Sequence, residues 1–122
     1  MDLKFEKLKL FSYSSCSTCR KAIKWLKSNK IDFELIDILS SPPSIEILVS
    51  AAQQYGDRKY LLNTSGVIYR SIGSEVFKKM NDNELFEKLF IEPRLIKRPF
   101  LVKSNKCFLI GFKEEKWVEK LL

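Results

Sequence analysis

A pair of cysteines stands where a strand pattern gives way to a helix pattern, and this junction restricts the possible folds more than any other feature. Apolar residues alternate with lysines over residues 7–13, which is typical of a strand. Cys16-Ser-Thr-Cys19 follows, and an amphipathic helix is predicted over residues 17–27 because apolar residues recur there at helical spacing. The apolar face of this helix is formed by Cys19, Ala22, Ile23 and Leu26.

A second strand is predicted soon after this helix. Residues 31–39 are rich in β-branched and aromatic side chains, so we expect a largely buried strand. Two strands joined through a helix form a βαβ unit with parallel strands and a right-handed crossover. The end of the first strand and the start of the helix then meet at the carboxyl edge of the sheet. This arrangement would place Cys16 at that edge.

The rest of the chain predicts a helical middle region, a hairpin and a last helix. In the middle region, proline and serine precede the first helical pattern, Gly56 ends it, and the capping sequence Asn-Asp-Asn precedes the second. The predicted helices of this region cover about 45–54 and 83–90. The C-terminal part is predicted to contain strands 98–102 and 107–112, joined by Lys-Ser-Asn-Lys, and a helix over about 114–121. The last helix is expected to pack Trp117, Val118 and Leu121 inward.

The order β-α-β, helices, β-β-α is that of the thioredoxin-like (glutaredoxin-like) α/β fold. We therefore expect a mixed four-stranded sheet with a helical insertion, about residues 41–92, between the βαβ and ββα halves. With 122 residues and only four glycines and four prolines, the chain fits a single domain over residues 1–122 without a flexible linker. A Cys-x-x-Cys sequence close to a βαβ pattern is the expected redox signature of such a fold.

The chain has three cysteines and no histidine. Histidine is the usual general base of cysteine and serine hydrolases and the commonest zinc ligand, so its absence argues against both kinds of site. Three cysteines without histidine cannot complete a four-ligand structural zinc site of the cysteine or cysteine–histidine type. We therefore expect no metal and no tightly bound cofactor.

The N-terminal sequence MDLKFEKLKLF alternates charged and apolar residues and lacks the apolar core of a signal peptide. No later run is apolar and long enough to cross a membrane, so a cytoplasmic protein without membrane contact is expected. The reducing cytoplasm favours free, catalytic or sensing thiols over a structural disulfide framework. The net charge of +7 is consistent with an acidic partner. Because the lysines are spread over several elements, direct nucleic-acid binding is not expected.

The cysteine pair has three alternative interpretations: a redox or nucleophilic site, half of a metal site, or two cysteines that pack as small apolar side chains. The first is favoured, because a thiolate is the nucleophilic form and the positive end of a helix stabilises it. Cys16, at the start of the helix, is the candidate nucleophile, and Arg20 and Lys21 add cations within one turn. Cys19 lies on the apolar face and is the candidate resolving thiol of a reversible Cys16–Cys19 disulfide.

Two further features have both a functional and a structural interpretation. Cys107 lies within the apolar run Cys-Phe-Leu-Ile, where a packed core or edge-strand residue is a simpler interpretation than a redox role. Arg98-Pro99 opens a predicted strand, and a cis proline beside a reactive thiol presents backbone groups to a substrate. A solvated surface cation is the alternative for Arg98.

Five stretches of the chain resemble, in order and spacing, the family of ArsC-type arsenate reductases and Spx-type transcription regulators. They are CSTCRKAIKWL, PPS, LLNTSGVIYRSIG, LIKRPFLV and IGFKEEKW. The resemblance covers nearly the whole chain and is greatest to the arsenate-reductase-like members without a settled substrate. It implies a thioredoxin-like core with a helical insertion, Cys16 as the reactive thiol, and Arg98 with a cis Pro99 facing that thiol.

The chain departs from the glutathione-linked arsenate reductases at positions that surround their oxyanion. These enzymes have two further arginines, which correspond to Asn63 and Gly111 here, and serine in place of Cys19. A tetrahedral oxyanion is held by charge-assisted hydrogen bonds of about 1.5–3 kcal/mol each. Losing two weakens arsenate binding by about two orders of magnitude or more, unless Arg58, Arg70 or backbone amides replace them. Spx-type proteins instead have a Cys-x-x-Cys pair that closes as a redox switch.

Two functions follow as hypotheses. In the favoured one, the protein is a thiol-disulfide oxidoreductase of the arsenate-reductase-like group, in which Cys16 attacks an oxidised small-molecule or protein substrate and Cys19 resolves the intermediate. Besides Arg98 as a catalytic cation, the expected substrate-binding residues are Arg20, Asn63 and Pro99. The resemblance implies glutathione as a co-substrate. In the alternative hypothesis, the protein is an Spx-type regulator that binds RNA polymerase and uses Cys16 and Cys19 as a redox sensor.

Overall fold

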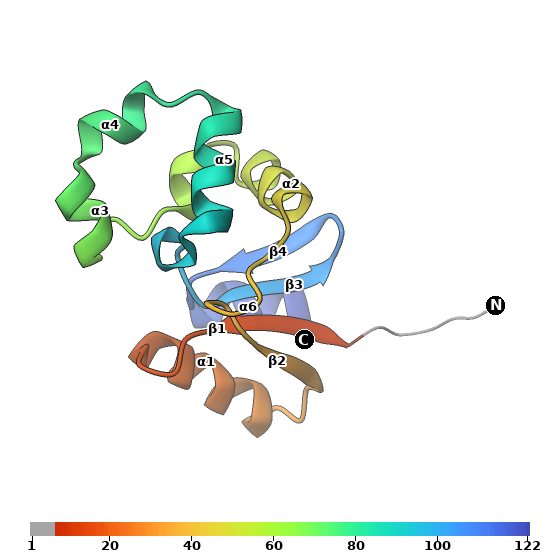
Figure 1. Cartoon of the computed structure of the whole chain (residues 1–122). Coiled ribbons are helices and arrows are strands. Elements are labelled where there is room, and N and C mark those ends of the chain that lie inside the picture. The colour runs from red at the N-terminus through yellow and green to blue at the C-terminus, as the bar shows by residue number, and fades with distance from the viewer. Residues whose placement is uncertain (1–6) are drawn as a thin grey trace.

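A four-stranded mixed sheet forms the centre of the computed structural model, which describes residues 7–122 (Figure 1). The strand order is β2-β1-β3-β4. β1 (Leu8–Ser12) is parallel to β2 (Phe33–Asp37), whereas β3 (Phe100–Ser104) is antiparallel to both β1 and β4 (Cys107–Ile110). This is the predicted α/β sheet of thioredoxin-like order, with a βαβ half and a ββα half.

One helix connects β1 to β2, another follows β4, and further helices form the region between the two halves. The helices of the two halves are α1 (Ser17–Ser28) and α6 (Glu114–Leu121). Between β2 and β3 the chain forms α2 (Ile45–Tyr55), η1 (Arg58–Leu61), α3 (Val67–Ile72), α4 (Ser74–Lys79), α5 (Asp82–Ile91) and η2 (Pro93–Leu95). No helix in the described part of the chain is long and apolar enough to span a membrane. Residues 1–6, on which part of the signal-peptide prediction rests, lie outside the described residues.

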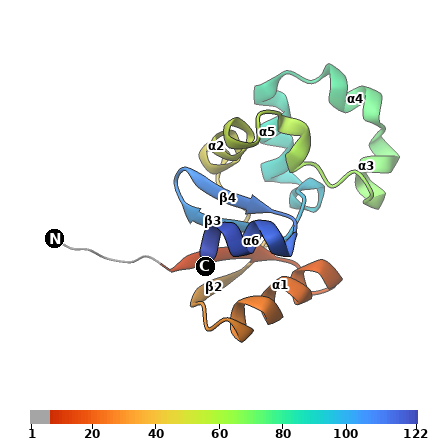
Figure 2. The ribbon, with the colours of Figure 1, turned by 180° about the vertical axis from the view of Figure 1, so that it is seen from behind.

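Alternate residues of the strands enter two apolar cores, one on each face of the sheet. The core covered by α1 and α6 contains Leu10, Leu101 and Leu109. The core covered by α2, α5 and the rest of the insertion contains Phe11, Phe100 and Phe108. Figure 2 shows the insertion helices above the sheet and α1 below it. Because a shift of one residue would exchange the two faces, this alternation fixes the strand register.

Capping residues mark the start of α2, the start of α5 and the end of α2. Ser44 Oγ accepts a hydrogen bond from Ile47 N at 3.2 Å, and Asn81 and Glu84 form a reciprocal capping box at the start of α5. α2 ends at Gly56, whose φ of 85° is a left-handed conformation that glycine adopts without steric cost. The predicted bounds of both helices are therefore confirmed to within one residue.

Two predictions about burial are wrong. β2 was predicted to be largely buried, but it is an edge strand, and Leu35 on it is 56% exposed. The apolar composition of this strand reflects Phe33 and Ile36, which are only partly covered by the two cores. Val118, predicted to pack inward, is 41% exposed because α6 faces the sheet with Trp117 instead.

The sequence patterns did not predict α3 and α4. Each has six residues, which is too short for a helical period to become apparent. The two helices meet at Gly73, and Tyr69 of α3 stacks on Phe77 of α4 with ring centroids 4.7 Å apart. A tertiary aromatic contact therefore stabilises this pair, and such a contact leaves no periodic signal in the sequence.

Candidate active site around Cys16

Cys16 lies at the N-cap of α1, directly after the turn that follows β1. Cys16 N donates to Tyr13 O at 3.0 Å and closes this turn, and Arg20 N donates to Cys16 O at 3.1 Å and starts the helix. Cys16 Sγ accepts a hydrogen bond from Cys19 N at 3.2 Å. The Cys16 sulfur therefore caps the N-terminus of α1 and lies at the positive end of the helix dipole. The structure thus holds Cys16 where the sequence placed the nucleophile.

Cys19 lies one turn further along α1 and is fully buried. The pKa of its thiol is raised from 9.0 to about 11, mainly because burial disfavours the thiolate. A hydrogen bond with the Cys16 side chain also raises this pKa, whereas hydrogen bonds with the Tyr13 backbone and the Ser12 side chain lower it. The two cysteines are therefore unequal: Cys16 is half-buried at the helix start, and Cys19 is a protonated thiol beneath it at neutral pH.

Arg98 reaches the site from the segment before β3. The Arg98–Pro99 peptide bond is cis, as the family resemblance implies. Arg98 Nη1 donates to Arg94 O at 3.2 Å and to Ile96 O at 3.3 Å, and Arg98 Cζ lies 4.9 Å from the ring centroid of Tyr13. None of the ion pairs between described residues includes Arg98. Its half-buried charge is therefore held by backbone and aromatic contacts and is available to an anion.

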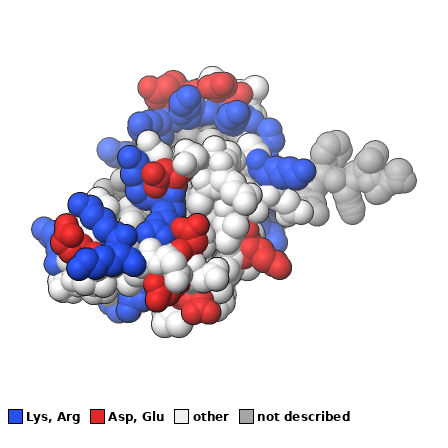
Figure 3. All heavy atoms as spheres, turned by 90° about the horizontal axis from the view of Figure 1, so that it is seen from above, with Lys and Arg blue, Asp and Glu red and all other residues white. Residues whose placement is uncertain are grey.

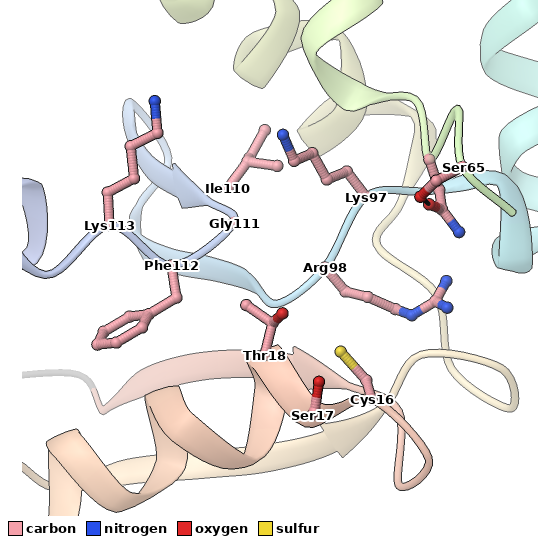
Figure 4. A pocket seen from close by; sticks show the side chains of 11 residues that line it. Cys16, Ser17, Thr18, Ser65, Lys97, Arg98, Ile110, Gly111, Phe112 and Lys113 are labelled. Atoms are coloured by element: carbon pink, nitrogen blue, oxygen red, sulfur yellow. Dashed lines mark hydrogen bonds between the residues drawn. The ribbon is translucent and has the colours of Figure 1, made fainter.

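A pocket of about 470 Å³, which we call the thiol pocket, joins these groups (Figure 4). It lies between the start of α1, the loop before α3, the segment before β3 and the segment after β4. Its principal lining residues are Cys16, Thr18, Asn63, Lys97, Arg98 and Lys113. Every charged side chain among the described lining residues is a cation. An anionic group in the thiol pocket is therefore favoured electrostatically.

Gly111 lies between two of these cations in the pocket wall. A Cβ at Gly111 would lie 3.3 Å from Cε of Lys97, so the Lys97 side chain covers the space that a side chain at position 111 would occupy. Gly111 N donates to Pro99 O at 2.8 Å, and Gly111 O accepts from Trp117 Nε1 at 3.1 Å, which fixes this turn to the sheet and to α6. Lys97 and Lys113 were not predicted as site residues. Their positions beside Arg98 and Gly111 in the motifs LIKRP and IGFK are the signal that could have found them.

Of the predicted substrate-binding residues Asn63 and Pro99, only Asn63 lines the thiol pocket. Asn63 lines it, but its side chain is engaged locally: Ser65 Oγ donates to Asn63 Oδ1 at 3.3 Å, and Asn63 Nδ2 lies 3.4 Å from Arg94 O. Pro99 is buried and does not line the pocket, and its oxygen accepts the hydrogen bond from Gly111 N. Direct contact of either residue with a substrate stays a prediction.

Arg20 is a predicted substrate-binding residue that lies away from the thiol pocket. It is exposed on α1, and its Nη1 donates to Ser14 O at 2.9 Å. Arg20 lines a separate hollow, together with Tyr13 and Leu35, on the side of the molecule where β2 forms the sheet edge. Its spacing of one helical turn from Cys16 placed it near the thiol in sequence, but the helix directs it outward.

The two arginines considered as replacements for the missing oxyanion ligands also lie elsewhere. Arg58 forms an ion pair with Asp82 at 2.8 Å and donates to Met80 O at 2.6 Å, so it ties η1 to the start of α5. Arg70 is exposed on α3, with Nε 3.4 Å from Gly66 O. Neither lines the thiol pocket.

Cys107 lies on β4, half-buried and outside the thiol pocket, in the edge-strand position that its sequence context predicted. Within residues 7–122, no group of three or more cysteine, aspartate and glutamate side chains could hold a metal ion.

Comparison with known proteins identifies one family. The model of the ArsC family matches residues 11–120. The chain is 38% identical to the uncharacterised protein YusI of Bacillus subtilis, over 92% of this chain and 96% of YusI. It is 30% identical to the regulatory protein MgsR of Bacillus subtilis, over 88% of this chain and 84% of MgsR. It is 27% identical to the global transcriptional regulator Spx of Lactiplantibacillus plantarum, over 87% of this chain and 80% of Spx.

Solved structures agree with this assignment. An ArsC family related protein from Bacteroides fragilis is similar with a TM-score of 0.83 and 34% identity, over 93% of this chain and 98% of that one. A possible arsenate reductase from Streptococcus mutans is similar with a TM-score of 0.83 and 33% identity, over 91% of this chain and 97% of that one. These likenesses confirm both the predicted fold and the resemblance from which part of the prediction came.

Proposed function

Because the chain belongs to the ArsC family, we propose that it is a thiol-disulfide oxidoreductase in which Cys16 is the nucleophile and Cys19 the resolving thiol. Arg98 is the cation that receives an anionic substrate. The observation that carries this proposal is the position of Cys16, whose sulfur caps α1 and lines a pocket in which all charged side chains among the described residues are cations. The helix N-terminus holds the sulfur at the pocket, and the cations of the pocket favour an anion-bearing substrate.

The reaction begins when the Cys16 thiolate attacks one sulfur of a substrate disulfide. A new S–S bond joins Cys16 to the substrate, the original S–S bond breaks, and its electron pair leaves with the second substrate sulfur as a thiolate. Arg98 stabilises the anionic groups of the substrate next to the reacting sulfur. Tyr13 keeps the Arg98 guanidinium in place through the face of its ring.

Cys19 then resolves the mixed disulfide. It loses its proton and attacks Cys16 Sγ, so that the Cys16–Cys19 disulfide forms and the bound substrate sulfur leaves as a thiolate. Two of the causes that raise the pKa of Cys19 come from Cys16 itself, namely its side-chain hydrogen bond and its charge. Once Cys16 is part of a mixed disulfide its charge is gone, so the pKa of Cys19 falls and the resolving step is promoted.

Two electrons have then passed from the cysteine pair to the substrate. Two molecules of a small thiol return them: the first opens the Cys16–Cys19 disulfide and becomes attached to Cys16, and the second attacks that mixed disulfide. The products are the oxidised small thiol and two reduced cysteines. Glutathione is the small thiol that the family resemblance implies.

Disulfides with anionic groups are preferred over arsenate in this proposal. Asn63 and Gly111 supply no cationic side chain, and Arg58 and Arg70 lie outside the pocket. Lysine replaces only part of what arginine provides, because an ammonium group carries charge without the planar pair of donors that holds an oxyanion at two points. Lys97 and Lys113 therefore suit carboxylate-bearing substrates better than a tetrahedral oxyanion.

Turnover with glutathione as reductant tests the proposal, using a glutathionylated peptide and arsenate as alternative substrates. The wild-type protein should reduce the peptide disulfide faster than arsenate, and Cys16→Ser should abolish both activities. When glutathione is omitted, Cys19→Ser should accumulate a mixed disulfide on Cys16, visible as an increase in intact mass. Cys107→Ser is the matched control that removes a cysteine outside the pocket. No wild-type turnover, together with no mixed disulfide in Cys19→Ser, would contradict the proposal.

The likeness to MgsR and Spx favours a second candidate, a redox-sensing regulator that binds RNA polymerase. In this case the Cys16–Cys19 disulfide would alter the surface around the start of α1, and no substrate would be turned over. A pull-down of RNA polymerase with reduced and with peroxide-treated protein distinguishes the two candidates. Redox-dependent retention of the polymerase, combined with absent glutathione-linked turnover, would favour the regulator.

A further inference from the structure

A second hollow continues the thiol pocket across β4 toward α6. It has a volume of about 370 Å³, and we call it the lysine groove. Its side-chain walls include Tyr55, Tyr60, Lys97, Lys113, Lys116 and Lys120. Lys97, Ile110, Gly111 and Lys113 line both the thiol pocket and the lysine groove. The two hollows are therefore parts of one surface depression that starts at Cys16.

Gly111 lies where the two hollows meet. Gly111 N donates a hydrogen bond to Pro99 O, and Gly111 O accepts one from Trp117 Nε1. The backbone of Gly111 is therefore held in place between the two hollows. The side chains of Lys97 and Lys113 extend on either side of Gly111, and both point away from the Cys16 sulfur (Figure 4). These two cations therefore face parts of a ligand that are remote from the reacting sulfur.

Among the described residues that line the lysine groove, the charged side chains are four lysines, and none is acidic. This differs from the molecule's upper face, where acidic and basic side chains lie side by side (Figure 3). A surface whose charged groups are all cations over two connected hollows attracts anionic ligands. The ligand favoured by the groove is therefore acidic along its length.

The β4 edge beside the groove is already occupied, which excludes recognition by an added strand. Gln54 Nε2 donates to Phe108 O at 2.9 Å, and Phe108 N donates to Gln54 Oε1 at 2.7 Å. Ile110 N donates to the Tyr55 hydroxyl at 2.8 Å. Because side chains of α2 satisfy these backbone groups, a ligand in the groove must be recognised by its side-chain charges rather than by backbone pairing.

We propose that the lysine groove binds an acidic peptide segment that flanks the oxidised cysteine of a protein substrate. This inference rests on the proposed function, since it places the substrate's sulfur at Cys16 and its acidic side chains at Lys97, Lys113, Lys116 and Lys120. A small disulfide would fill only the thiol pocket. The groove makes the protein selective for acidic polypeptide disulfides over neutral ones.

Peptide binding and peptide turnover test this inference with different readouts. For binding, a fluorescently labelled glutamate-rich peptide with serine at the cysteine position is compared, by anisotropy at low ionic strength, with its glutamine counterpart. The wild-type protein should bind the acidic peptide roughly tenfold more tightly, a preference that several weak surface ion pairs can supply and that salt should screen. For turnover, the same two sequences carry a glutathionylated cysteine, and the ratio of their kcat/KM values is measured.

Two matched double variants remove the same number of charges. Lys116→Gln/Lys120→Gln changes the groove, and Lys24→Gln/Lys27→Gln changes exposed lysines of α1 that line neither hollow. The groove variant should lose about threefold or more of the preference for the acidic peptide, both in binding and in the kcat/KM ratio. The α1 variant should retain the preference. A salt-dependent preference that both variants lose equally would show a general charge effect and would overturn the inference.

Other outcomes separate this inference from the proposed function. Equal kcat/KM values for acidic and neutral peptides, with turnover intact, would overturn the groove and leave the oxidoreductase standing. Selective binding of the acidic peptide without any turnover would support the groove and refute the oxidoreductase. A short single-stranded RNA that binds more tightly than the acidic peptide, and that depends on Lys116 and Lys120, would identify a nucleic-acid groove and overturn the assignment to a peptide.

Discussion

Iodoacetamide at pH 8 is expected to modify Cys16 much faster than Cys19. Cys16 is half-buried at the start of α1 and lines the thiol pocket, whereas Cys19 is fully buried one turn later. The reagent attacks thiolates, so both ionisation and access control the rate. The order of labelling therefore tests the division of roles between nucleophile and resolving thiol.

The effect of ionisation can be worked out from the pKa of Cys19. At pH 8 a thiol with a pKa of 9.0 is about one-tenth thiolate, whereas a thiol with a pKa of about 11 is about one-thousandth thiolate, a decrease of about a hundredfold. The more basic thiolate is more nucleophilic by about tenfold, because the Brønsted slope is about 0.4–0.5. Ionisation alone slows Cys19 by only about tenfold. Any larger difference must come from burial, which requires local opening before the reagent can reach the sulfur.

Peptide-resolved mass spectrometry over a series of times and pH values measures both rates. A Cys107→Ser background leaves only the two site cysteines. In the folded protein we expect Cys19 to react at least about a hundredfold more slowly than Cys16 at pH 8, because burial adds to the tenfold effect of ionisation. In concentrated urea the two rates should approach each other.

A third variant separates the causes of the raised pKa. Cys16→Ala removes the hydrogen bond and the charge of Cys16, so Cys19 should be labelled somewhat faster, but it should remain slow because desolvation is the largest cause. If Cys19 in the folded wild-type protein reacts as fast as Cys16 below pH 8, the burial argument fails and the two roles must be exchanged.

Three further predictions concern stability and the cations of the site. Because the folded-state pKa of Cys19 lies above its unfolded value of 9.0, its contribution to stability is complete below pH 9 and is lost as pH rises through about 11, by at most about 3 kcal/mol. Urea unfolding at several pH values should show this loss in the wild type and not in Cys19→Ala. Arg98→Ala should lower kcat/KM on oxidised glutathione, and the kcat/KM of Arg98→Lys should lie between those of Arg98→Ala and wild type because lysine restores the charge without the paired donors of the guanidinium. Equal kcat/KM values in all three proteins would show that Arg98 takes no part in the reaction. Gly111→Arg should lower the free energy of unfolding by about 1–2 kcal/mol, because φ is 75° and Lys97 covers the site, and thermal unfolding that matches wild type would contradict this.

The last of these predictions changes an expectation that follows from sequence alone. Correspondence with the arsenate reductases suggests that arginines at Asn63 and Gly111 would together restore an oxyanion site. The structure gives position 111 a left-handed backbone and a Lys97 side chain packed over it. An arginine there would strain the turn and displace a cation that is already present. Adding Asn63→Arg alone is therefore the better route to arsenate binding.

The sequence was sufficient for features that depend on residues close to each other along the chain. The Cys16 N-cap, the Gly56 stop and the bounds of α6 each depend on residues within about one turn, and all were predicted from sequence. The mixed four-stranded sheet followed from the order of the elements, and the cis bond before Pro99 followed from the family resemblance.

Features that depend on distant residues could not be predicted in this way. The exposure of Leu35 depends on β2 being at the sheet edge, and the outward direction of Arg20 depends on how α1 packs. The contact between Lys97 and Gly111 joins two segments that flank a hairpin, so neither sequence motif reveals it alone. The apolar runs and the charge spacing of a segment predict which element it forms, but they do not predict which other elements pack against it.

A thiol with a pKa of about 11 can still resolve a disulfide because its reaction is intramolecular. At neutral pH only about one Cys19 in ten thousand would be ionised at that pKa, which would make it a poor competitor against an external thiol in solution. However, Cys19 lies one turn from Cys16, and well-oriented intramolecular groups reach effective molarities of about 10⁵ M or more. Against an external thiol at millimolar concentration, this advantage exceeds the loss through protonation, even before the removal of the Cys16 charge lowers the pKa of Cys19. The mixed disulfide should therefore be short-lived in the wild type and long-lived in Cys19→Ser, so the lifetime of that species measures the contribution of the buried thiol directly.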